Sequence, residues 1–83
     1  MYTIAYYAKR TVDGIVYEEK YPGEDFRVKK NALHFLRKEL KERYIENGYT
    51  VEDVKNGINC YKSKINTKGL REAIETRVRI EKM

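Results

Sequence analysis

Apolar and polar side chains alternate over the first 26 residues, on both sides of one turn sequence. Asp13-Gly14 stands between apolar neighbours, and Asp-Gly in that setting favours a two-residue type I′ turn. Such a turn fixes the hairpin register and so assigns each residue to one face of the ribbon. This register pairs Lys9 with Glu18 on a mainly polar face. The opposite, mainly apolar face carries Tyr2, Ile4, Tyr6, Ala8, Arg10, Val12, Ile15, Tyr17, Glu19 and Tyr21.

A helical period follows the hairpin. We expect one long helix from roughly Val28 to Glu46, because Asn47-Gly48 is typical of a helix C-terminus. Apolar residues recur there every three or four positions and form one stripe. The stripe consists of Leu33, Leu36, Leu40 and Tyr44. We expect it to pack on the apolar face of the hairpin.

Residues 50–65 fit two interpretations. Apolar residues recur at spacings of three and four, which is a helical period, at Val51, Val54, Ile58, Tyr61 and Ile65. Asn56-Gly57 lies in the middle, where a helical glycine costs about 1 kcal/mol relative to alanine. The same pair could turn a second hairpin between 49–54 and 58–65. Because the alternation over 58–64 is poor, the pattern favours a second, shorter helix.

The last segment has the pattern of a half-buried strand. Ile74, Thr76, Val78 and Ile80 alternate with charged residues, and all four are β-branched. The sequence therefore predicts a β-β-α-α-β order over one domain, residues 1–83. This is an α+β fold in which one long and one shorter helix pack on one face. The C-terminal strand completes a small, mainly antiparallel sheet with the N-terminal β-hairpin.

Composition excludes several classes of protein. The longest apolar run spans only residues 4–8, far below the ~20 residues of a membrane span, and no secretory signal pattern begins the chain. We therefore expect a cytoplasmic protein without a membrane partner. Cys60 and His34 are the only residues of their types, which is too few for a structural zinc site with four ligands. We expect no metal and no cofactor.

No motif indicates catalysis. A nucleophile needs a nearby base, and nothing in the sequence ties Cys60 to His34. The five glycines are isolated, so no phosphate-binding glycine loop is present. Adjacent carboxylates such as Glu18 and Glu19 point to opposite faces of a strand. We therefore predict a protein that is not an enzyme and has no catalytic residues.

Charge gives the strongest functional indication. The net charge is +5, and residues 27–48 carry seven basic and three acidic side chains, against three and five in residues 1–26. One flank of the long helix is expected to carry Lys30, His34, Arg37, Lys38 and Lys41, with Arg27 close to its start. Basic side chains in such a row suit phosphates or acidic side chains. A second basic cluster consists of Lys62, Lys64, Lys68 and Arg71, with Arg77 and Arg79 on the outer face of the last strand. Arg77 and Arg79 would share a sheet face with Tyr7, Lys9 and Lys20 if the last strand joins the hairpin.

These features predict a small non-enzymatic binding protein that docks through its basic helix flank on an acidic macromolecular surface, either an acidic protein surface or nucleic acid. The short chain, rich in Lys, Ile, Asn and Tyr, suits an accessory or inhibitory protein of a phage or mobile element. Two alternatives stay open. One is a module that binds DNA or RNA directly through the same residues. The other is an oligomer, a dimer for example, that binds a small anionic ligand or a nucleotide.

Overall fold

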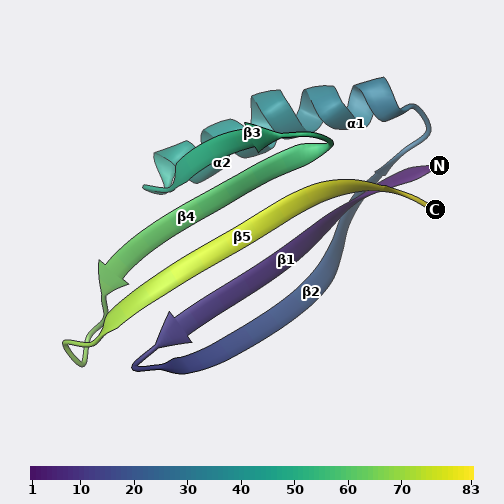
Figure 1. Ribbon diagram of the computed structural model, residues 1–83. Coiled ribbons are helices and arrows are strands. Elements are labelled where there is room, and N and C mark those ends of the chain that lie inside the picture. Colours follow the sequence, from purple (N-terminus) through teal and green to yellow (C-terminus); the bar gives the residue numbers. More distant parts are fainter.

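The computed structural model describes residues 1–83 as one antiparallel sheet with a helix across one face (Figure 1). The helix runs from Lys29 to Glu46 as α1 (Lys29–Phe35), a π-helical segment (Leu36–Leu40) and α2 (Lys41–Glu46). The strands are β1 (Tyr2–Val12), β2 (Ile15–Phe26), β3 (Thr50–Val54), β4 (Gly57–Ile65) and β5 (Arg71–Lys82). Their order in the sheet is β2-β1-β5-β4-β3. The α+β class is therefore as predicted.

The N-terminal hairpin has the predicted turn and register. Asp13 has φ 50° and Gly14 has φ 78°, the two left-handed conformations that a type I′ turn requires. Val12 lies opposite Ile15. Further along, Lys9 lies opposite Glu18.

The predicted second helix is wrong, and so is the β-β-α-α-β order. Residues 50–65 form the antiparallel hairpin β3–β4, in which Val54 lies opposite Gly57 and Asn56 takes a left-handed φ of 60°. The true order is β-β-α-β-β-β. Apolar and polar residues alternate poorly in β4 because the face of this strand that the helix covers continues beyond the end of the helix. Lys62 lies on that part of the face and donates from Nζ to the Asn47 carbonyl at 2.6 Å.

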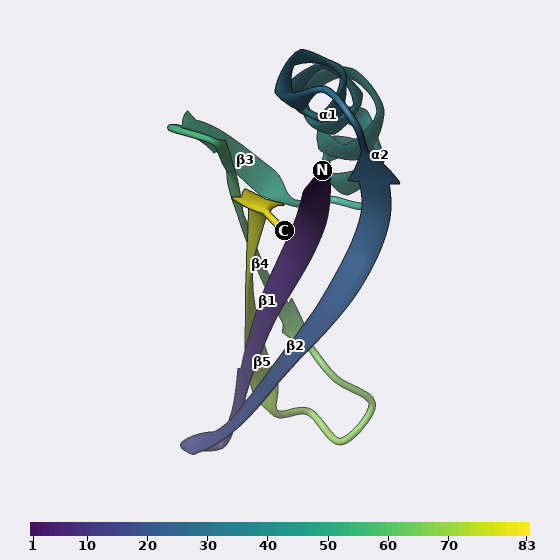
Figure 2. The same cartoon turned by 90° about the vertical axis from the view of Figure 1, so that its right-hand side faces the viewer.

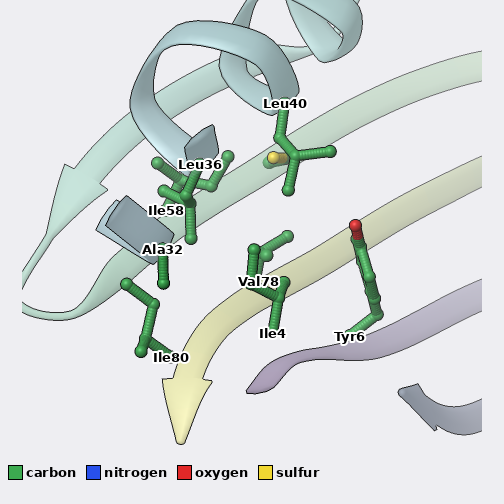
Figure 3. Packing of buried hydrophobic residues seen from close by; sticks show 9 residues of the cluster. Ile4, Tyr6, Ala32, Leu36, Leu40, Ile58, Val78 and Ile80 are labelled. Atoms are coloured by element: carbon green, nitrogen blue, oxygen red, sulfur yellow. The ribbon is translucent and has the colours of Figure 1, made fainter. Parts of the chain in front are cut away.

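The core lies between the helix and the part of the sheet that the helix covers (Figure 3). Leu36 of the helix is fully buried, and Ala32 and Leu40 are buried beside it. The predicted stripe is shifted slightly, because Leu33 and Tyr44 lie at the margin of this cluster. The strands contribute Ile4, Tyr6, Ile58, Cys60, Val78 and Ile80.

β5 joins the hairpin as predicted, but as a central strand. It pairs with β1 on one side and with β4 on the other, so that the first and last strands lie side by side (Figure 1). The sheet also extends beyond the helix: the molecule measures 44 × 23 × 19 Å, and the two distal turns lie far from the helix (Figure 2). No helix of the chain combines the length and the apolar character needed to cross a bilayer.

Candidate binding surface

The helix presents a row of basic side chains next to strand β3. Because Leu36 and Leu40 point into the core, the helical repeat directs the residues about a third of a turn away from them toward the surface on the β3 side. Arg37 and Lys41 are half-buried beside β3, and Lys30, His34 and Lys38 are exposed on the helix. We call this row the basic flank; its members are Lys30, His34, Arg37, Lys38 and Lys41.

One carboxylate on β3 fixes two members of the basic flank. Arg37 Nη1 lies 3.4 Å from Asp53 Oδ1, and Lys41 Nζ lies 3.1 Å from Asp53 Oδ2. Arg37 also donates from Nη2 to the Val54 carbonyl at 3.2 Å. About a third of each basic side chain still contacts solvent. Asp53 thus holds two long side chains in place and neutralises one of their two charges.

The structure adds a cation that the sequence did not place on this surface. Lys55 is exposed in the β3–β4 turn and directly follows Val54, whose carbonyl binds Arg37. Sequence analysis missed it because residues 50–65 were expected to be helical. Arg27 is exposed just before the helix, as predicted. The basic flank, Arg27 and Lys55 together leave a clear excess of positive charge over Asp53.

Arg77 and Arg79 lie on the opposite face of the sheet, which no helix covers. The register places Arg77 opposite Tyr7 and Arg79 opposite Ala5, so the predicted shared face exists. The Tyr7 ring, however, is enclosed by two cations, with Lys20 Nζ at 5.0 Å and Arg77 Cζ at 5.3 Å from its centroid. The Tyr7 hydroxyl donates to Glu81. This ring is therefore engaged within the chain and is not presented for stacking on a base.

Arg79 is also engaged within the fold. Its Nη1 donates to the carbonyls of Ile58 at 2.9 Å and Val78 at 3.0 Å. Its Nη2 donates to Asn59 Oδ1 at 2.6 Å. The two bonds to Ile58 and Asn59 tie β5 to β4 beside Gly57, and the third stays within β5. Arg79 therefore connects two strands rather than extending toward a ligand.

The open face as a whole has no excess of either charge. Basic and acidic side chains are equally numerous on it, and the pairing places several of them next to each other, as Lys9 is between Glu18 and Glu75. The charged residues of this face are Lys9, Lys20, Arg71, Arg77, Arg79, Glu18, Asp25, Glu52, Glu75 and Glu81. A balanced face of this kind does not attract phosphates over long range. The net charge of +5 is therefore carried by residues outside the open face.

Cys60 and His34 do not form a catalytic pair. Cys60 is fully buried in the core, and burial raises the pKa of its thiol to about 11, so the reactive thiolate is absent near neutral pH. His34 lies on the exposed side of the helix. No group of three or more His, Cys, Asp or Glu side chains is arranged to hold a metal ion.

A hollow of about 380 Å³ lies between the C-terminal end of the helix and the sheet. Its walls include Tyr44 and Tyr49, whose rings meet edge to face at 5.1 Å between centroids. Lys62 Nζ lies 5.2 Å from the centroid of the Tyr49 ring. Burial raises the pKa of Tyr44 and of Tyr49, so both phenols stay protonated donors at neutral pH. The size and lining fit a small anionic ligand, but Lys62 already bonds Asn47.

The chain matches no protein-family model, and no curated protein matches it significantly. The functional argument therefore rests on the geometry and charge of the basic flank.

Proposed function

We propose that this chain is a small, non-enzymatic binding protein that docks on an acidic protein surface through its basic flank. The observation that carries the proposal is the uneven charge. Arg37 and Lys41 of the basic flank share one carboxylate, Asp53, and Arg27, Lys30, Lys38 and Lys55 are exposed without an ion pair, whereas the open sheet face is balanced. A one-sided positive field steers an acidic partner toward the helix and accelerates encounter.

The support of the flank by β3 suits such a role. Flexible lysine and arginine side chains lose rotamer entropy when they bind, and Asp53 already restricts Arg37 and Lys41 in the free protein. Side chains that are already ordered in the free protein therefore lose less conformational entropy on docking. The short basic chain would suit an accessory or inhibitory protein of a phage or mobile element that occludes a site on a host protein.

Direct binding of DNA or RNA is the second candidate, and the same cations support it. A helix with exposed basic side chains contacts phosphates irrespective of sequence. The basic flank contains no Tyr, Phe or Trp and a single imidazole, that of His34, and Tyr7 on the other face is enclosed. Stacking on unpaired bases, which single-strand binders use, therefore has no support here. An acidic protein surface is the partner that the arrangement favours.

The test compares two double charge reversals that change net charge equally. Lys30→Glu with Lys38→Glu alters the exposed part of the basic flank. Lys64→Glu with Lys68→Glu alters two exposed lysines at the distal end of the sheet and serves as the control. The probes are fluorescent polyglutamate and single- and double-stranded oligonucleotides, titrated by anisotropy at two salt concentrations.

We expect the flank variant to bind polyglutamate at least tenfold more weakly than the control does. If oligonucleotides bind more tightly than polyglutamate, and the flank variant lowers the slope of log affinity against log salt by about one unit per lost phosphate contact, the second candidate replaces the first. Equal losses in both variants, or no binding of any probe by the unmodified protein at low salt, would refute a role for the flank.

A further inference from the structure

Strand β2 forms a long sheet edge that nothing covers. It is the terminal strand of the sheet, and residues 15–22 are all exposed. Four large apolar side chains of this strand, between 40% and 57% exposed, are Ile15, Val16, Tyr17 and Tyr21. The opposite edge, β3, has only five residues and is tied to the helix through Asp53. An uncovered edge of this length is a template for another strand.

The turn at Asp13-Gly14 determines which backbone groups of β2 face outward. In a two-residue hairpin the residues that flank the turn exchange both of their hydrogen bonds, and inward and outward positions then alternate. The outward positions are therefore Val16, Glu18, Lys20 and Pro22. Pro22 has no N–H, and its outward position costs the β1–β2 ladder no hydrogen bond. An antiparallel neighbour centred near residue 19 would receive about six backbone hydrogen bonds.

We propose that two copies of this chain pair antiparallel through their β2 edges, about a two-fold axis at Glu19. Rotation about an axis perpendicular to the sheet leaves each side chain on the same face of the sheet. The residue at the axis must therefore lie opposite the same residue of the second copy. With Glu19 at the axis, Glu18 of each copy lies opposite Lys20 of the other. Centring on Glu18 or Lys20 would instead place like charges of that residue opposite each other. The two Glu18–Lys20 pairs thus favour this register over those centred on Glu18 or Lys20, although it places Glu19 opposite its own copy.

The covered face supports the same register. Tyr17 of one copy lies opposite Tyr21 of the other, and both rings are exposed in the single chain. Tyr21 already stacks on Tyr6, with 5.0 Å between ring centroids and 8° between ring planes. Pairing therefore extends this stack by one ring on each side of the axis, and aromatic cross-strand pairs stabilise sheets.

The resulting assembly is one ten-stranded sheet with both helices on the same face. Its interface is limited to two strands and their side chains, which is below the usual size of a stable interface, about 1,200 Å² or more. We therefore expect a dissociation constant in the micromolar range or weaker. The two Glu19 carboxylates repel each other at the axis, so Glu19→Gln tightens the dimer. The dimer does not depend on what the basic flank binds.

Sedimentation equilibrium tests the charge pairing. Glu18→Lys and Lys20→Glu each place like charges across the axis and should weaken the dimer at least tenfold. The double variant restores opposite charges and should return the dissociation constant to within about threefold of the original. Glu75→Lys reverses a charge on the same face away from β2 and is the control. A monomer at all concentrations, or a double variant as weak as the singles, overturns the proposal.

Disulfide trapping tests the register directly. Glu19→Cys places two thiols on Cα atoms about 4.5 Å apart, as in a non-hydrogen-bonded pair, within the range that a disulfide spans. Tyr17→Cys is exposed on the same face, but its counterpart in the second copy is about 14 Å away. Cys60 is buried and does not compete. Rapid covalent dimerisation of Glu19→Cys alone is expected; equal or faster crosslinking of Tyr17→Cys would overturn the register.

Discussion

Replacing Asp53 with asparagine separates the stabilising role of the basic flank from its binding role. Asp53 contacts both Arg37 and Lys41, so Asp53→Asn removes the only carboxylate that pairs with these two cations and changes the side-chain volume little. Both pairs are partly exposed, and exposed ion pairs contribute only about 0.2–1 kcal/mol each. We expect the free energy of unfolding to fall by about 1 kcal/mol.

The same change should strengthen the binding of a polyanion. An anionic group bound to the outer side of Lys41 would lie about 6 Å from the Asp53 carboxylate, because that carboxylate is 3.1 Å from Lys41 Nζ on the inner side. Two unit charges at about 6 Å in water repel by about 0.7 kcal/mol. Removing that repulsion raises affinity about threefold. The gain should be largest near 0.01 M salt, where screening extends over about 30 Å.

The assay is anisotropy titration of polyglutamate, with urea denaturation of the same samples for stability. Asp13→Asn is the matched control, since it removes the same charge at the distal turn and Asn-Gly preserves a type I′ turn. An equal gain in both variants would refute the inference that Asp53 offsets the charge of a binding surface. Weaker binding by Asp53→Asn would show that its ordering of Arg37 and Lys41 outweighs the repulsion, and would refute the predicted gain.

Three further predictions concern the core. Leu36→Ala should lower the free energy of unfolding by about 3–4 kcal/mol in urea denaturation, because Leu36 is fully buried and its loss leaves a cavity; a loss under 1 kcal/mol would contradict this packing. Gly57→Ala should cost about 3 kcal/mol or more, because a Cβ there would lie 2.0 Å from the Val78 carbonyl oxygen; unchanged melting would contradict the close approach. Cys60 should not react with a thiol reagent at pH 8 until the protein unfolds. Because its pKa rises from 9.0 to about 11 in the fold, the unfolded chain ionises first, and stability should fall as pH increases from 9 to 11.

The first hairpin was predictable because residues close together in the sequence determine it. Asp13-Gly14 sets the turn, and the turn sets every pairing as far as Tyr21. The alternation of β5 was equally clear. Its place between β1 and β4 was not, because it depends on pairing between residues about seventy positions apart, which no local pattern encodes.

The second hairpin was missed because a short helical period arose by coincidence. Val51 and Ile58 lie on the covered face, whereas Val54, Tyr61 and Ile65 lie on the open face. The five residues thus never share one stripe. Their spacing comes from two short strands joined by a two-residue turn. Asn-Gly did indicate a hairpin, but the turn is centred one residue earlier than that pair, on Lys55-Asn56, because Gly57 already pairs with Val54 and Asn56 alone is left-handed.

The candidate surface was half predictable. The helical period placed Lys30 and Lys38 on an exposed flank correctly. It did not reveal that Arg37 and Lys41 share Asp53, because that contact requires β3 beside the helix. Lys55 joined the surface for the same reason. Contacts within one helix or strand follow from the spacing of its residues along the sequence. Contacts between two elements depend on how the fold places those elements next to each other.

The central position of β5 has a consequence for the order of folding. The hairpins β1–β2 and β3–β4 can each close locally, but only β5 joins them into one sheet, and it does so through long-range pairings that slow folding. The Met83 N–H donates to the Met1 carbonyl at 2.9 Å. A circular permutant that links these ends and opens at Asp13-Gly14 would make β5–β1 a local hairpin. Such a permutant makes β1–β2 the long-range pairing in place of β5–β1, so it should keep the same sheet and fold at a similar rate, with the order in which β1 gains its two neighbours reversed.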